Sequence, residues 1–271
     1  MHTFQIKTYE IPTERIKENR EIRFAVLADL HGFLYGEENR ELIQAIKAAR
    51  PDAVLCVGDL SVRTKPETLE VAEKLLKSLV KEFPVYYALG NHEYKMKFSE
   101  FGECYEAYEK RLSMEGVRFL HNQKTSQRIG ETWCHFYGLE LPLDYYKKPK
   151  SRKLTQTELE GYLGTVQGEG MHILLAHNPK YGTTYFSWGA DLILSGHYHG
   201  GIVRLSEHCG LTCPQYLLFP PYCCGDFHRG NRHMVVSAGL GEHTIPVRIH
   251  NKRELLIISL KQREDAYGNS R

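Results

Sequence analysis

The feature that most constrains the fold of this chain is an alternation of short apolar runs with amphipathic segments in its first half. Three runs have the length and composition of buried β-strands: 22–28, 53–57 and 85–89. Apolar residues recur at helical spacing in the intervening segments 42–49 and 69–79, and a third helix is expected at 99–115. This order predicts an α/β fold in which helices cover central sheets.

The second half of the chain also contains short apolar runs of strand type. These runs lie at 117–120, 127–129, 133–139, 172–176, 190–195, 234–238 and 255–260. Because no linker, repeat or low-complexity segment separates them, residues 1–271 are predicted to form a single domain. Its core is expected at about 20–262, and the polar residues after Gln262 are expected to form a flexible tail.

Residues that can bind a metal ion follow the ends of five of these runs. They are Asp29, His31, Asp59, Asn91, His92, His177, His197 and His199. Because sites in open α/β sheets gather at the carboxyl ends of strands, these side chains should meet at one edge. The glycines that flank the pair in Gly196-His197-Tyr198-His199-Gly200 would let that loop approach an ion closely.

The chemistry of these side chains favours a pair of divalent metal ions. Carboxylate, amide and imidazole donors without a thiolate suit Mn²⁺, Fe²⁺ or Zn²⁺. All except His92 are candidate ligands, which is too many for one ion but suits two ions about 3.5–4 Å apart that share a carboxylate. Such a pair holds a hydroxide nucleophile and clamps phosphoryl oxygens. His92 directly follows Asn91 and so remains free to donate a proton to the leaving oxygen as general acid.

Each motif also has a purely structural interpretation. Asp29 could cap a helix or occupy a turn, and Gly58-Asp59 and Gly90-Asn91 are ordinary turn dipeptides. His177 could cap the helix after Asn178-Pro179. Five unrelated coincidences in this order would be needed, so the metal site is the favoured hypothesis.

Together these motifs resemble the five ordered motifs of the calcineurin-like metallophosphoesterase superfamily. The matching segments are Asp29-x-His31, Gly58-Asp59, Gly90-Asn91-His92-Glu93, His177 and Gly196-His197-x-His199. A bacterial branch of small phosphoesterases looks most similar, on the segments His199-Gly200-Gly201, Ser237-x-Gly239-Leu240-Gly241 and Ile245-Pro246-x-Arg248. The resemblance implies two mixed β-sheets packed as a sandwich and flanked by helices, in four layers.

The resemblance also implies a role for each site residue. The implied ligands are Asp29, His31 and His199 for the first metal and Asn91, His177 and His197 for the second, with Asp59 bridging the two. His92 would contact the substrate phosphate and act as general acid. Calcineurin-type phosphatases carry an aspartate shortly after the Gly-Asp motif that orients this histidine, whereas Leu60-Ser61-Val62-Arg63 contains none.

The predicted function is therefore metal-dependent hydrolysis of phosphoesters, as a phosphodiesterase acting on a small or lipid-linked substrate. Two divalent ions are the expected cofactors, with Mn²⁺ preferred and Fe²⁺/Fe³⁺ or Zn²⁺ as alternatives. There are two other hypotheses. One is a phosphomonoesterase or protein phosphatase, and the other is a metal-bearing scaffold that binds phosphoryl groups without turnover. Few arginines near the Gly-Asp and Gly-Asn-His-Glu motifs disfavour a protein phosphatase.

Composition limits the other partners and the compartment. The net charge is +2, from 35 basic and 33 acidic residues, so no stable nucleic-acid partner is expected. No apolar run approaches transmembrane length, and the N-terminus has no signal-peptide core. Seven cysteines, an odd number, favour a reducing cytoplasmic setting. The sequence does not indicate an oligomeric state.

Two loops remain open to interpretation. Residues 205–232 are expected to form an aromatic and cysteine-rich loop, whose apolar part at 211–222 is either a substrate lid or a flap packed on the sheet. The basic segment 147–153 is either a solvated surface or a region that recruits phosphate.

Overall fold

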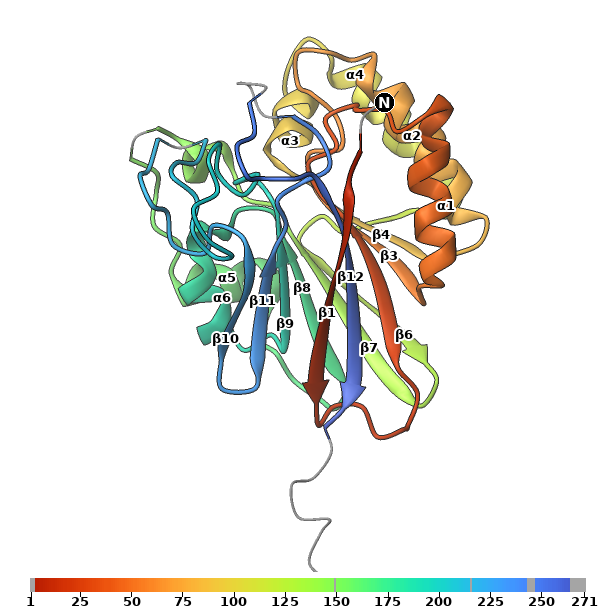
Figure 1. The fold of residues 1–271 in the computed structure, drawn as a ribbon, viewed down its shortest axis with the longest axis vertical. Helices are drawn as coiled ribbons and strands as arrows, with labels where there is room; N and C mark the ends of the chain where they lie inside the picture. Colours follow the sequence, from red (N-terminus) through yellow and green to blue (C-terminus); the bar gives the residue numbers. More distant parts are fainter. Residues whose placement is uncertain (1–2, 149, 215, 243–246, 264–271) are drawn as a thin grey trace, which may run out of the picture.

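Two mixed β-sheets of six strands each pack face to face, and helices cover both outer sides (Figure 1). The computed structural model of the protein describes residues 3–148, 150–214, 216–242 and 247–263. The predicted α/β class and the flanked two-sheet sandwich are confirmed. Most of the tail predicted after Gln262 lies outside the described residues. The Ile245-Pro246 pair lies wholly outside them.

The first sheet is built from the beginning and the end of the chain. Its order is β1 (Gln5–Thr13), β12 (Glu254–Gln262), β2 (Ile22–Leu27), β3 (Ala53–Val57), β4 (Val85–Ala88) and β5 (Arg118–Phe119). Strands β2 to β5 are parallel, as expected for strands joined by helical crossovers. Strand β12 is antiparallel to β2 and parallel to β1.

The second sheet comes from the middle of the chain. Its order is β10 (Gly225–Arg229), β11 (Arg232–Val236), β9 (Leu192–Ser195), β8 (Met171–Ala176), β7 (Thr132–Leu139) and β6 (Gln123–Ile129). Strands β7, β8, β9 and β11 are parallel, and antiparallel hairpins add β6 and β10 at the two edges. In both sheets, parallel strands therefore direct several carboxyl ends to the same edge.

The helices form the two outer layers. They are α1 (Arg40–Ala49), α2 (Thr68–Val80), α3 (Asn91–Lys97), α4 (Gly102–Met114), α5 (Gln156–Leu163) and α6 (Gly182–Trp188), with short 3₁₀ turns η1 (Glu37–Asn39), η2 (Leu143–Tyr146) and η3 (Pro179–Tyr181). Helices α1, α2 and α4 pack on the outer face of the first sheet, and α5 and α6 pack on that of the second (Figure 1). Within the described ranges, every helix is too short or too polar to span a lipid bilayer.

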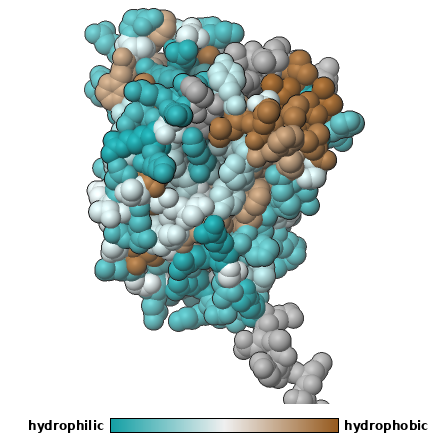
Figure 2. All heavy atoms as spheres, turned by 90° about the vertical axis from the view of Figure 1, so that its left-hand side faces the viewer, coloured by the Kyte–Doolittle hydropathy of each residue, from teal (hydrophilic) through white to brown (hydrophobic). Residues whose placement is uncertain are grey.

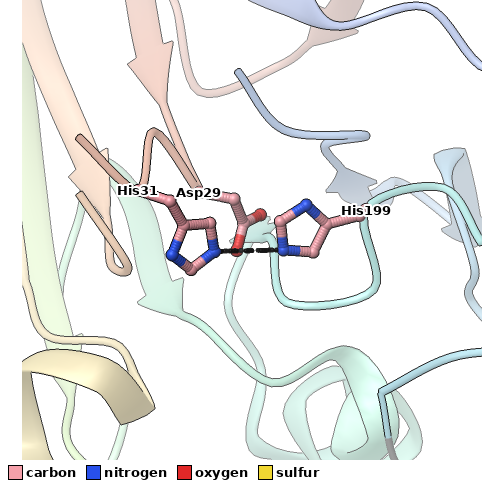
Figure 3. Close-up of side chains that lie close together, drawn as sticks. All are labelled: Asp29, His31 and His199. Atoms are coloured by element: carbon pink, nitrogen blue, oxygen red, sulfur yellow. Dashed lines mark hydrogen bonds and ion pairs between the residues drawn. The ribbon is translucent and has the colours of Figure 1, made fainter. Parts of the chain in front are cut away.

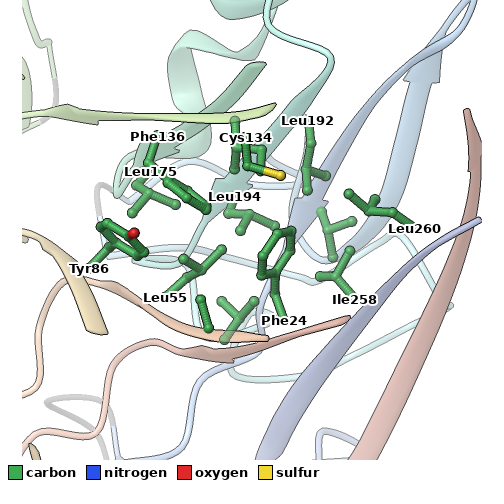
Figure 4. Packing of buried hydrophobic residues seen from close by; sticks show 14 of the residues in the cluster. Phe24, Leu55, Tyr86, Cys134, Phe136, Leu175, Leu192, Leu194, Ile258 and Leu260 are labelled. Carbon is green, nitrogen blue, oxygen red and sulfur yellow. The ribbon is translucent and has the colours of Figure 1, made fainter. Parts of the chain in front are cut away.

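Alternate residues of each buried strand enter different cores. In β2, Phe24 and Val26 face the second sheet, whereas Ala25 and Leu27 face the helices. Phe24 packs edge-on against Phe136 of β7, with ring centroids 5.7 Å apart (Figure 4). Because both faces of these central strands are buried, they appear in the sequence as continuous apolar runs.

Several sequence-based boundaries were wrong. The strand expected at 127–129 begins earlier, at Gln123. The helix expected at 99–115 begins at Gly102, and a separate helix, α3, starts at Asn91 inside the Gly-Asn-His-Glu motif. The loop expected at 205–232 contains a strand, β10, at its end. Strand β10 is a largely polar edge strand, so it lacks the apolar pattern that marks buried strands.

A half-buried ionic contact at His121 links α4 to the end of β7 and makes stability depend on pH. The imidazole lies 2.8 Å from both the Glu109 and the Glu140 carboxylates, and these contacts raise the pKa of His121 to about 9. A raised pKa in the folded state stabilises the protein below the unfolded pKa of 6.5, and this stabilisation is lost as pH rises through about 9.

Between pH 6.5 and about 9, the free energy of unfolding of the wild type should therefore fall. This fall should exceed that of His121→Gln by about 1–2 kcal/mol. Denaturant unfolding of both proteins across that range measures the difference. If the free energy of unfolding changes with pH equally in the two proteins, the contact contributes no pH-dependent stability.

Candidate metal centre

The eight predicted site residues follow the ends of five strands of the two sheets, six of them in loops and Asn91 and His92 in the first turn of α3. After β2 come Asp29 and His31, after β3 Asp59, after β4 Asn91 and His92, after β8 His177, and after β9 His197 and His199. Backbone hydrogen bonds join neighbouring loops: the amide of Asp29 donates to the Gly58 carbonyl and the amide of His31 to the Asp59 carbonyl, each at 3.0 Å. The folded chain thus brings together residues that are up to 170 positions apart, since His199 minus Asp29 spans that distance in sequence.

Five of these residues have a left-handed backbone. Their φ angles are 53° for Asp29, 51° for His31, 55° for Asp59, 67° for His197 and 49° for His199. Side chains with a Cβ atom adopt this region rarely, and it costs energy that tends to persist at functional sites. A turn with only a structural role would be served better by glycine, so the strain favours a chemical role for these side chains.

Two glycines allow the loops after β3 and β4 to touch. A Cβ atom on Gly58 would collide with the backbone nitrogen of Gly90, and one on Gly90 would collide with the Asp59 carboxylate. Gly58 also has a φ of +83°, a conformation that strains any other residue. These glycines are therefore required for Asp59 and Asn91 to lie at the same site.

Asp29, His31 and His199 form the first group of donor atoms (Figure 3). The Nε2 atoms of His31 and His199 are 3.2 Å apart, and Asp29 Oδ1 lies 3.5 Å from His199 Nε2 and 4.0 Å from His31 Nε2. Bonds of about 2.1 Å to one ion would place adjacent ligand atoms roughly 3–3.5 Å apart. Two imidazoles and one carboxylate at this spacing can hold a first-row divalent ion on one side.

Asp59, His177 and His197 form a second group beside the first. His177 Nδ1 donates to the Val57 carbonyl at 2.7 Å, which leaves Nε2 directed at Asp59 Oδ2, 3.1 Å away. This backbone partner fixes the ring orientation in the way that is usual for histidines that bind metals. His177 Nε2 is also only 3.9 Å from Asp29 Oδ1, so the two groups are contiguous.

The carboxylates are buried among these imidazoles, which perturbs the pKa values of both. Burial raises the pKa of Asp29 to about 7. Burial also opposes the charge on Asp59, but His177 and His92 outweigh it and hold the pKa of Asp59 well below its usual value. Burial lowers the pKa of His177, yet the Asp59 and Asp29 carboxylates raise it to about 9. A site that favours an imidazolium this strongly provides the negative field that also favours a divalent cation.

Asn91 adds a neutral oxygen donor to the second group. Its Oδ1 atom is buried and has no hydrogen-bond partner among the described residues. A buried amide oxygen normally has a partner, so an atom of this kind at a cluster of imidazoles and carboxylates fits a metal ligand. The donors present are thus those expected for Mn²⁺, Fe²⁺ or Zn²⁺.

His92 lies at the edge of the donor groups, and its ring is oriented by the main chain. The Arg63 backbone amide donates to His92 Nδ1 at 3.1 Å, so the proton of the neutral ring is on Nε2. Burial lowers the pKa of His92, which favours this neutral form. The segment after Gly58-Asp59 contains no aspartate that could orient this histidine, and the structure shows the Arg63 backbone amide bonded to its ring instead.

Glu93 is a structural member of the centre that the sequence analysis did not assign. Its fully buried carboxylate accepts hydrogen bonds from the amides of Asp59, Ser61 and Gly90 at 2.8–3.1 Å. The hydroxyls of Ser61 and Tyr87 donate to the same side chain at 3.2 and 3.0 Å. One carboxylate therefore fixes both loops that carry Asp59 and Asn91.

Glu93→Gln should destabilise the metal-free protein by about 2–4 kcal/mol, because the side-chain amide cannot accept from donors on both sides and leaves some of them buried without a partner. Denaturant unfolding measures this loss. Glu106→Gln is the matched control, since Glu106 is exposed on α4. Equal stability of the two variants would contradict the proposed anchoring role.

The donor atoms open into a cavity of about 650 Å³ with a cationic wall. The wall includes Arg63, Lys65, Lys95 and Lys148, and Tyr146 and Pro214 line it as well. Burial lowers the pKa of Lys95, which lies three residues after His92 on α3. Residues three positions apart lie on the same face of a helix, so a prediction of α3 would have placed Lys95 beside His92 in the site. Tyr146 carries no local sequence signal.

Gly241 and Arg248, near the C-terminus, support the centre from behind. The Gly241 amide donates to the Asp29 carbonyl at 2.6 Å. Arg248 donates to the carbonyls of Ala238 and Gly241, and its Nη2 atom lies 3.4 Å from His199 Nδ1. This segment therefore positions the loop that carries Asp29.

Comparison with known proteins places this arrangement in a family. Residues 22–201 match the family model described as calcineurin-like phosphoesterase. A Danio rerio protein named transmembrane protein with metallophosphoesterase domain is 29% identical over 263 residues, which cover 93% of this chain and 56% of the relative. An uncharacterized metallophosphoesterase of Aquifex aeolicus is 24% identical over 259 residues, which cover 95% of this chain and 92% of the relative.

The chain thus spans little more than half the length of the Danio rerio relative. Among solved structures, the phosphopantetheinyl hydrolase of Mycobacterium tuberculosis aligns with a TM-score of 0.49 and 12% identity over 81% of this chain and 89% of that one.

Proposed function

This chain belongs to the calcineurin-like phosphoesterase family, and we propose that it is a dinuclear-metal phosphodiesterase. The observation that carries this proposal is the set of three overlapping groups of carboxylate and imidazole atoms: Asp29–His31–His199, His31–Asp59–His92 and Asp59–His177–His197. Because His31 and Asp59 each belong to two groups, the donors form one continuous site with room for two ions.

We assign the ligands by the first and third of these groups and by the buried Asn91 oxygen that has no hydrogen-bond partner among the described residues. Asp29, His31 and His199 would hold one ion, Asn91, His177 and His197 would hold the other, and Asp59 would contact both. When bound, two such ions lower the pKa of water to near neutrality and neutralise charge on a phosphoryl group. Mn²⁺ is our first choice of metal, because the donor set is rich in oxygen and imidazole and has no thiolate.

The remaining residues of the cavity would bind the substrate and move a proton. Arg63, Lys95 and Lys148 would attract and orient a phosphoryl anion by charge. His92 holds its proton on Nε2 and would donate it to the leaving oxygen. Glu93 and the Arg63 amide would keep Asp59 and His92 in place through the reaction.

The size of the cavity supports a diester as substrate. A volume of about 650 Å³ exceeds what a phosphate with one small substituent needs, and it is in the range of pockets for drug-sized ligands. All seven cysteines are free thiols, which supports our proposal of a reducing, cytoplasmic setting.

Turnover of matched substrates tests the proposed reaction. Metal-free protein is reconstituted with Mn²⁺ and assayed with bis(p-nitrophenyl) phosphate, p-nitrophenyl phosphate and a phosphorylated protein. We expect the diester to give the highest kcat/KM and the chelated protein to be inactive. A preference for the monoester or the phosphoprotein would replace phosphodiesterase by phosphomonoesterase. Metal binding without turnover of any ester would leave only a phosphoryl-binding scaffold.

A further inference from the structure

A group of exposed apolar side chains lies on loops next to the candidate metal centre. We call it the apolar rim and define it as Leu205, Tyr216, Leu218, Phe219, Val247 and Ile249. Tyr216, Leu218 and Phe219 are 74%, 69% and 57% exposed. Figure 2, which views the molecule from the left-hand side of Figure 1, shows apolar residues gathered at its upper right, while most of the remaining surface in view is polar. The sequence predicted a lid or a packed flap here, but these three side chains do not pack on the sheet.

Main-chain hydrogen bonds anchor parts of the rim. The Phe219 amide donates to the Leu211 carbonyl at 3.0 Å, and the Leu211 amide donates to the Val203 carbonyl at 2.8 Å. Val203 also forms a bridge with Ile249. The φ angles of Tyr216 and Phe219 are 59° and 49°, which is costly for large side chains. A well-bonded loop that strains its backbone while leaving apolar side chains in water indicates a surface built for contact.

The rim borders the cavity of the metal centre. Pro214, two residues before Tyr216, lines that cavity. A narrow pocket lined by His199, Pro214 and Val247 connects the rim to a predicted metal ligand. Lys148, another residue of the cavity wall, has its Nζ atom 4.5 Å from the centroid of the Tyr216 ring.

Exposed cations without acidic partners line the pockets next to the rim. Arg63, Lys65 and Lys148 are exposed and line the metal-centre cavity, and Lys252 is exposed in a surface pocket that it shares with Leu205 of the rim. Among the described residues, none of these four takes part in an ion pair. The nearby acids are already neutralised, since Glu207 pairs with Lys7 and Glu242 with Arg253. The rim is therefore an apolar surface bordered by net positive charge.

We propose that the apolar rim docks on an anionic phospholipid surface and that the substrate is a phosphoester anchored in that surface. Apolar and aromatic side chains at loop tips would enter the interfacial layer, and the surrounding lysines and Arg63 would contact lipid phosphates. The exposed apolar side chains and the cations without acidic partners beside them match the two chemistries of such a surface, which are acyl chains and phosphates. The substrate class rests on the proposed function, but docking itself does not.

Vesicle sedimentation tests the docking step. The full chain is mixed with vesicles of phosphatidylcholine alone or with phosphatidylglycerol, and we expect binding to the anionic vesicles that weakens as salt is added. The double variant Leu218→Asp/Phe219→Asp should bind them at least about tenfold more weakly. Met114→Asp is the matched control, because Met114 is 80% exposed on α4 and lies outside the rim. Lys252→Glu should weaken binding to the anionic vesicles and leave any binding to vesicles of phosphatidylcholine alone unchanged.

Turnover separates failure of docking from failure of the proposed reaction. The double variant should hydrolyse soluble bis(p-nitrophenyl) phosphate as the wild type does, which also shows that it folds, but should lose at least about tenfold in turnover of a phosphodiester lipid in anionic vesicles. Equal vesicle binding by wild type and double variant would overturn the proposal. Analytical ultracentrifugation tests whether the rim binds a second copy of the chain instead. Self-association of the wild type that is lost in the double variant would also overturn the proposal. Vesicle binding by a protein inactive on every soluble ester would refute the proposed reaction and leave docking intact.

Discussion

Asp59→Asn should remove bound metal and lower kcat/KM by more than about 100-fold, because even partners outside the ligand set typically cost 10–100-fold when changed. Asp59 Oδ1 accepts from the His92 amide at 2.8 Å, while Oδ2 lies 3.1 Å from His177 Nε2. Asparagine keeps the size of the side chain and can still accept from this amide. It lacks the negative charge that would attract two cations, so the loss would come from charge and not from a cavity.

Metal content after gel filtration, measured together with kcat/KM, distinguishes this explanation from loss of folding. Asp226→Asn is the control of equal chemistry: Asp226 lies on the edge strand β10, where it pairs with His233. We expect that control to keep its metals and its turnover. An Asp59→Asn protein that retains two metals per chain and wild-type kcat/KM would show that Asp59 is not a ligand.

His92→Ala should keep both metals but lower kcat by about 10²–10⁴-fold, the usual contribution of a general acid. The loss should grow as the leaving group becomes more basic, because a poor leaving group depends more on the proton that His92 Nε2 would donate. Removal of the ring also frees the Arg63 amide, which can then bond to water because Arg63 is exposed. The effect on stability should therefore be small.

A series of aryl phosphodiesters with leaving groups of different pKa measures this dependence. His228→Ala, at an exposed position on β10, is the control histidine and should behave as the wild type. A loss of the same size for every leaving group would assign His92 to phosphate binding alone, and unchanged turnover would remove it from the reaction.

The sequence predicted the positions of the site loops well, for a physical reason. Asp29, Asp59 and Asn91 each follow an apolar run, and parallel strands joined by helices must direct their carboxyl ends to one edge. Pairing of the second sheet against the first was available from the family resemblance, not from periodicity, because local patterns do not specify which strands meet. The path of β1 beside β12 at the opposite end of the chain is a contact of this kind.

The sequence did not indicate the hydrogen bonds made by main-chain groups, nor which side chains are buried or exposed. The partner of His92 is an amide of Arg63, and every residue except proline has such a group. Glu93 was part of a recognised motif, but its role depends on three backbone donors from two loops. The apolar composition of 211–222 was evident, yet only the structure shows that Leu218 and Phe219 face away from the protein.

The number of metal ions bound per chain is the most direct measure of the central claim. Metal-free protein is titrated with Mn²⁺, and bound metal is counted by elemental analysis at saturation. The three overlapping donor groups predict two ions per chain in the wild type and a loss of both when Asp59 is changed to asparagine. Saturation at one ion or fewer, or equal metal content in the two proteins, would contradict a dinuclear centre.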